Sequence, residues 1–212
     1  LVHADANDKT GGRYVGYRLG VQLWAKLTND LRLTFEPSYI LMEHFDRSDG
    51  RVRYDQADFK LGLAVLFRNK LQRNNDLNPA KDALPERGFF IGGGLGWNTT
   101  INKWRYTDRS RGLLLNFNGF AGYNFNMYHG AKLMVDYIAN PIWQQNRSGD
   151  LSKFTYKNTF ISADYQLNVL NAMAGYRPSR RWGVNLYGGP SLVLSEYGKK
   201  ADVGANVGGM IS

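Results

Sequence analysis

The stretch that decides the fold class is YVGYRLGVQLWAKL, residues 14–27. Apolar side chains occupy every second position from Val15 to Leu27, and Arg18, Gln22 and Lys26 lie among the residues between them. A strand places these two sets on opposite faces, whereas a helix would scatter the apolar set around its surface. We therefore expect a β-strand with one apolar and one polar face.

The same period recurs along the rest of the chain. Further strands are expected at about 31–41, 57–67, 89–101, 113–125, 131–143, 155–176, 182–197 and 202–212. Short turns at 28–30, 127–129 and 178–181 alternate with longer polar loops at 44–55, 105–112 and 144–153. Consecutive strands joined in this way predict an antiparallel up-and-down β-barrel in one domain over residues 1–212. The segment from Leu71 to Arg87 breaks the alternation, because a short turn is due there.

Composition narrows the functional classes. The 212 residues include no cysteine, which excludes a disulfide scaffold and thiolate metal sites. No run approaches the ~20 apolar residues that a transmembrane helix needs. The net charge of +9 is dispersed along the chain. Because the basic residues form no stripe, we expect no nucleic-acid partner.

The polar face indicates which side of the sheet is inside. Gly92, Gly94, Gly96 and Asn98 alternate on the polar face of one strand, and such small and amide residues suit a crowded, hydrated lumen. The apolar face should then meet lipid, where aromatic rings gather at the two headgroup levels. Two such bands are expected, one of Phe67, Phe89, Tyr123, Phe125 and Trp182 near the short turns, and one of Tyr39, Phe59, Trp97, Tyr137 and Trp143 near the long loops.

These Gly- and Tyr-rich alternating strands with Asn-rich polar faces resemble the outer-membrane β-barrel superfamily over residues 14–212. The resemblance implies a multi-pass barrel in a Gram-negative-type outer membrane, surrounded by outer-membrane lipid and lipopolysaccharide. Residues 1–12 fall on the long-loop side, and the last strand runs to Ser212. We therefore expect a segment of a larger barrel, incomplete at both ends, with at least nine strands here and ten or more in all.

Two groups of charged residues are candidate sites. Three arginines, Arg105, Arg109 and Arg111, lie in one long loop and are expected to contact outer-leaflet phosphates. Charges of mixed sign on the lumen face either line a pore or form a salt-bridged plug. These lumen charges are Arg18, Arg32, Glu36, Asp58, Lys60, Asp136 and Asp164.

Signs of catalysis or cofactor binding are weak. The three histidines lack metal-ligand spacing, and no Gly-Lys-Ser/Thr follows the glycines at 92–96. Glu43, His44 and Ser48 suggest at most a lipid-modifying barrel enzyme. We predict no catalytic residue, cofactor or metal, and a non-enzymatic barrel with a structural or complex-forming role. A diffusion pore or transport barrel is the alternative, and the 71–87 segment is the candidate contact for a membrane or periplasmic protein partner.

Overall fold

The alternating segments form nine strands in a computed structural model that describes residues 13–28, 30–46, 50–67, 88–100, 114–145, 151–175, 183–195 and 200–211. The strands are β1 (Arg13–Lys26), β2 (Leu31–Asp46), β3 (Gly50–Phe67), β4 (Gly88–Thr100), β5 (Leu114–Asn124), β6 (His129–Gln145), β7 (Leu151–Asn168), β8 (Val184–Ser195) and β9 (Lys200–Ile211).

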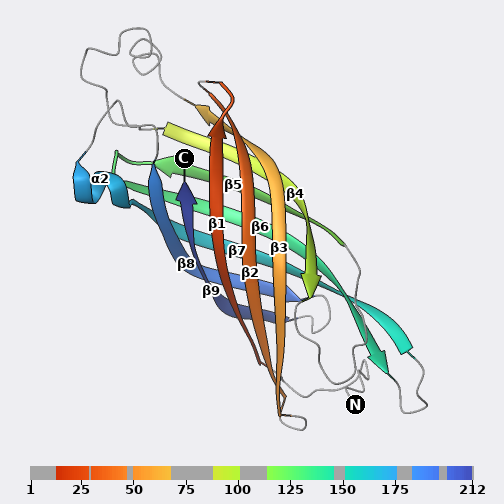
Figure 1. Cartoon of the computed structure of the whole chain (residues 1–212). Coiled ribbons are helices and arrows are strands. Elements are labelled where there is room, and N and C mark those ends of the chain that lie inside the picture. The colour runs from red at the N-terminus through yellow and green to blue at the C-terminus, as the bar shows by residue number, and fades with distance from the viewer. Residues whose placement is uncertain are drawn as a thin grey trace.

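The nine strands close into one barrel in their sequence order (Figure 1). Each strand pairs antiparallel with the next along the chain. The closing pair is parallel, from Gly16 opposite Gly204 to Leu23 opposite Ile211. An odd number of alternating strands leaves the first and last pointing the same way. The prediction of a purely antiparallel barrel was therefore wrong at this seam, and the described strands close at nine where ten or more were expected.

Three predicted boundaries also differ from the structure, and the first is the loop expected at 144–153, where β6 and β7 stay paired up to Gln145 opposite Leu151. The loop expected at 44–55 is mostly strand, because β2 and β3 stay paired up to Asp46 opposite Gly50. The strand expected at 155–176 ends at Asn168 and continues as helix α2 (Val169–Ala174). The Asn168 side chain caps this helix by accepting a hydrogen bond from the backbone N–H of Asn171. No helix among the described residues is long and apolar enough to cross a membrane.

The two faces of the sheet are assigned as the sequence predicts. Apolar side chains on the outer face are exposed, for example Leu19 at 62%, Leu95 at 68% and Val203 at 72%. Polar and charged side chains on the inner face are buried, Asp58 and Asp136 completely. The period of two therefore fixes the orientation of each strand correctly.

The interior also contains two apolar clusters that the sequence analysis does not foresee. In one of them the Trp24 and Phe90 rings meet edge to face with their centroids 5.7 Å apart. Its members are Trp24, Ala64, Phe90, Phe120, Met134, Tyr187 and Met210. The other consists of Ile40, Ile138, Phe160 and Val193. Glycines paired with the aromatic residues on adjacent strands make room for the large rings. A Cβ atom at Gly92 would lie 2.5 Å from the Phe120 ring, and one at Gly208 would lie 2.4 Å from the Tyr187 ring.

Candidate functional site: a buried network of charges

Six of the seven predicted lumen charges are buried inside the barrel, and five of them form one connected network. Alternate residues of a strand share a face, so β2 presents Glu36 and Ser38 inward together, and β3 presents Asp58 and Lys60. The seventh, Arg32, is half-buried at the end of the barrel that carries the short turns after β1 and β5, which we call the turn end. Its guanidinium donates to the carbonyl oxygen of Thr28 at 2.6 Å.

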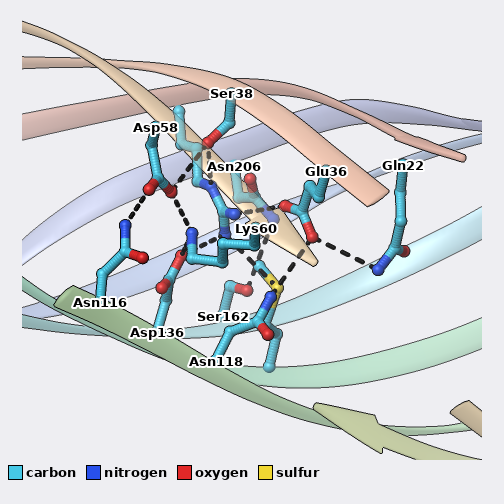
Figure 2. A network of polar contacts seen from close by, with 12 residues as sticks. Gln22, Glu36, Ser38, Asp58, Lys60, Asn116, Asn118, Asp136, Ser162 and Asn206 are labelled. Atoms are coloured by element: carbon cyan, nitrogen blue, oxygen red, sulfur yellow. Dashed lines mark hydrogen bonds and ion pairs between the residues drawn. The ribbon is translucent and has the colours of Figure 1, made fainter. Parts of the chain in front are cut away.

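The five connected charges alternate in sign along a chain from Glu36 to Asp58 (Figure 2). Arg18 pairs with Glu36 on one side, and its Nη1 lies 2.8 Å from Oδ2 of Asp136 on the other. Oδ2 of Asp136 also lies 2.9 Å from Nζ of Lys60, which in turn pairs with Asp58. Asp136 is therefore the centre of the chain, and it ties β6 to β1 and β3 across the lumen.

Neutral donors hold the acidic ends of this chain. Gln22 and Asn118 donate their side-chain N–H groups to Oε2 of Glu36, at 3.3 Å and 3.4 Å. The Ser38 hydroxyl donates to Oδ2 of Asp58 at 3.2 Å, and Asn116 donates to Oδ1 of the same carboxylate. Each terminal carboxylate thus has one cation and two neutral donors. This satisfies the requirement that a buried charge be paired and hydrogen-bonded.

A second, smaller group surrounds Lys132. Its ammonium lies 3.7 Å from Oδ2 of Asp164 and 3.5 Å from the centroid of the Tyr187 ring. Asn206 on β9 donates to both carboxylate oxygens of Asp164, at 3.1 Å and 2.9 Å. The sequence analysis predicts Asp164 but misses Lys132 and Tyr187. The alternation of faces could have identified Lys132, because it lies two residues before the buried Met134 and four before Asp136 on the same strand.

Glycines of β4 make the space that the network occupies. A Cβ atom at Gly96 would lie 2.6 Å from Oδ1 of Asn116 and 2.8 Å from Cγ of Lys60. One at Gly94 would lie 3.1 Å from Oδ1 of Asn118. The glycines at 92–96 therefore serve close packing, which is the interpretation that the sequence favours over a phosphate-binding loop.

The charges of the interior are nearly balanced. The buried ionic side chains of the described residues are three bases, Arg18, Lys60 and Lys132, and four acids, Glu36, Asp58, Asp136 and Asp164. Every acid and every base among them has at least one ionic partner. Within the described residues no three His, Cys, Asp or Glu side chains are grouped so that they would hold a metal ion. The arrangement is suited to linking strands across the lumen.

Several predicted residues cannot be placed. Arg105, Arg109 and Arg111, the 71–87 segment and Ser48 all lie outside the described residues. Glu43 and His44, expected at the mouth of a loop, are instead part of β2, although the structure does not describe their side chains. The suggested grouping of Glu43, His44 and Ser48 therefore stays a prediction.

Comparison with known proteins gave no relative. No family model matches the chain, and searches among curated proteins and solved structures found no similar protein. The functional interpretation therefore depends on the barrel itself.

Proposed function

We propose that this chain is an integral outer-membrane β-barrel protein without enzymatic activity, with a structural or complex-forming role. The observation that carries the proposal is that apolar side chains lie outside the barrel and charged side chains inside it, the reverse of a water-soluble protein. Among the described residues, the outer face exposes large apolar side chains on all nine strands, while the inner face buries seven charged side chains. A barrel that exposes its apolar face to water would have a contiguous patch far larger than monomeric soluble proteins tolerate. A lipid environment removes that cost.

Aromatic pairs near both ends of the outer face support a membrane setting. Phe67 and Phe89 lie 5.7 Å apart near the turn end, and Tyr123 and Phe125 are also 5.7 Å apart at that end. Toward the loop end, Phe59 stacks on Trp97 at 6.1 Å and Phe117 on Tyr137 at 4.8 Å. Aromatic rings favour the two headgroup levels of a bilayer.

The filled lumen favours a closed barrel over a diffusion pore. The charged network and the two apolar clusters occupy the interior with side chains that are at most 9% exposed. Barrels of about eight strands have an interior just wide enough for side chains to fill, whereas about sixteen strands leave an aqueous channel. Here nine strands close the barrel. The mixed charges are best interpreted as internal cross-links between strands.

A non-enzymatic role is supported by the pairing of the interior charges. Glu36, Asp58, Asp136 and Asp164 each contact a base, and the buried Ser38 donates its hydroxyl proton to Asp58. A catalytic serine needs a neighbouring base that accepts its proton and is itself accessible to substrate. The buried Ser38 hydrogen-bonds to a carboxylate that is itself paired with Lys60, and neither group is accessible to a substrate.

The proposal extends to two sequence segments outside the described residues. The loop with Arg105, Arg109 and Arg111 would contact phosphates of lipopolysaccharide, since the arginine fork suits phosphate oxygens. The segment 71–87 follows β3 at the turn end, where a partner protein in the periplasm or membrane would meet it. Replacing residues 74–84 by an Asn-Gly turn should leave the barrel folded and abolish co-purification of that partner. A shortened protein that keeps all partners would refute this contact.

Fluorescence quenching in brominated lipid tests the membrane assignment directly. Trp97 is 47% exposed on the outer face, while Trp24 is 9% exposed inside the barrel. Two single-tryptophan variants, each with the other four tryptophans changed to Phe, provide a matched pair. We expect brominated phosphatidylcholine to quench Trp97 strongly and Trp24 weakly. Equal quenching of both, or quenching of Trp24 alone, would contradict the proposed placement.

A further inference from the structure

Helix α2 (Val169–Ala174) lies outside the barrel at its turn end and is hydrogen-bonded to it (Figure 1). It continues directly from β7, and the backbone N–H of Asn168 donates to the carbonyl oxygen of Tyr128 at 2.7 Å. The side chain of Asn171 donates to the carbonyl oxygen of Met127 at 2.8 Å. Both acceptors belong to the turn between β5 and β6. The barrel thus holds this short helix in a defined place beside the ends of its strands.

The free side of α2 is apolar. The helix carries no acidic residue in its first turn and no basic residue in its last. Val169 and Leu170 are half-buried, whereas Ala172, Met173 and Ala174 are exposed. Met173 is 82% exposed, the highest value among the large hydrophobic side chains of the described residues. Exposure of this apolar surface to water would cost free energy. A partner that covers it must therefore lie at the turn end of the barrel, where α2 is.

The surroundings of α2 mark the headgroup level of a bilayer. Tyr165 projects outward from β7 just before the helix and is 53% exposed, and its hydroxyl lies 2.5 Å from Nδ1 of His129. Tyr123 and Phe125 belong to the aromatic band at the same end. Amphipathic rings and an apolar helix face together match the boundary between headgroups and acyl chains.

We propose that α2 is an interfacial helix that inserts Met173 into the phospholipid leaflet at the turn end of the barrel. The occupant of its apolar face is the boundary between headgroups and acyl chains, where such helices bury their apolar side by about 5–10 Å. Tyr123, Phe125 and Tyr165 lie at the same end of the barrel as the helix. This inference rests on the proposed membrane placement and adds a second lipid contact, outside the barrel wall.

The experiment uses the whole chain, which has no native cysteine, so that single cysteines carry the probe. An environment-sensitive fluorophore is attached to Met173→Cys, Leu63→Cys or Lys26→Cys after refolding into phosphatidylcholine vesicles. Leu63 lies on the outer face. Lys26 is exposed at the same end as α2, and it belongs to the alternate positions of β1 that face the lumen. Bromines are placed either near the headgroup or deep in the acyl chain. Vesicles of pure lipid exclude any protein partner.

We expect the probe at Met173 to be quenched most by shallow bromines, the probe at Leu63 most by deep ones, and the probe at Lys26 by neither. Quenching at Leu63 with none at Met173 would overturn the inference and leave the membrane barrel intact, and it would point to a protein as the partner of α2. Quenching at neither Leu63 nor Met173 would refute the proposed membrane placement itself. Quenching of Met173 by deep bromines would show that α2 lies within the acyl region, which also contradicts an interfacial position.

Discussion

Lys60→Met should destabilise the barrel more than Asp136→Asn, although both changes act on the same ion pair. Lys60 contacts Asp58 and Asp136, and Asp136 contacts Lys60 and Arg18. Removing Lys60 leaves two bases against four acids in the interior, whereas neutralising Asp136 leaves three of each. The first change creates uncompensated buried charge, and the second removes the existing excess. Met is an unbranched side chain of similar length, so loss of volume does not explain the difference.

The expected magnitudes follow from this count. Lys60 is 2% exposed, and its loss leaves the buried Asp58 without a cation and Asp136 with Arg18 alone, at a cost of about 3–5 kcal/mol. Asp136→Asn keeps the pairs of Arg18 with Glu36 and of Lys60 with Asp58. It loses charge-assisted hydrogen bonds, each contributing about 1.5–3 kcal/mol, and partly regains them through the amide oxygen. In the double variant the two costs should be less than additive, because the residues are in direct contact.

The assay is equilibrium unfolding in urea after refolding into lipid vesicles, monitored by tryptophan fluorescence. Lys26→Met, a change of the same type at an exposed position, is the control and should alter the free energy of unfolding by less than about 0.5 kcal/mol. An Asp136→Asn variant less stable than Lys60→Met would refute the charge count. A Lys60→Met variant as stable as the control would show that the network contributes nothing to stability.

Three further changes test other parts of the structure. Leu63→Arg places a charge on the lipid face, which should destabilise the barrel by ~2–4 kcal/mol and impair its assembly. Leu63→Met should assemble normally. Equal assembly of both variants would mean that this face does not meet lipid. Gly96→Ala should destabilise the barrel by about 1–3 kcal/mol, because the added Cβ would lie 1.9 Å from the carbonyl oxygen of Phe59. Gly119→Ala is the control and should be neutral or slightly stabilising, because no heavy atom lies within 4 Å of the added Cβ. Equilibrium unfolding of the two variants side by side tests this difference. A cysteine at Ser110, in the arginine-rich loop, should react with a membrane-impermeant reagent on intact cells, and labelling only after lysis would place that loop on the periplasmic side.

One substitution suggested by strand parity alone is unsuitable as a mild control. Gly62 shares the inner parity of β3, and Gly62→Ser would therefore be expected to be tolerated better than a charge at Leu63. The structure contradicts this expectation, since a Cβ atom at Gly62 would lie 2.2 Å from the carbonyl oxygen of Gly93 and 2.7 Å from Cα of Gly94. Backbone atoms cannot move aside as a flexible side chain does. Parity predicts which way a residue faces but not how much room it has.

The amino-acid sequence by itself determined the number of strands described, the faces of those strands and six of the seven buried charges. Alternation is a local property: each strand turns successive side chains to opposite sides, so Leu63 and Asp58 are assigned to the outer and inner face without knowledge of any partner. Charges on the inner face must find opposite charges, which made Arg18, Glu36, Lys60 and Asp136 candidates before their contacts were known.

Tertiary structure alone decided how the sheet closes and which charges meet. The parallel seam between β1 and β9, and the contacts of Asp136 with Arg18 and Lys60, depend on the number of strands and on the stagger between them. Neither quantity is encoded in the period of a single strand. Helix α2 likewise depends on Asn168 and Asn171 meeting the turn at Met127 and Tyr128, about forty residues earlier in the sequence. Such contacts exist only once the barrel has brought distant strands side by side.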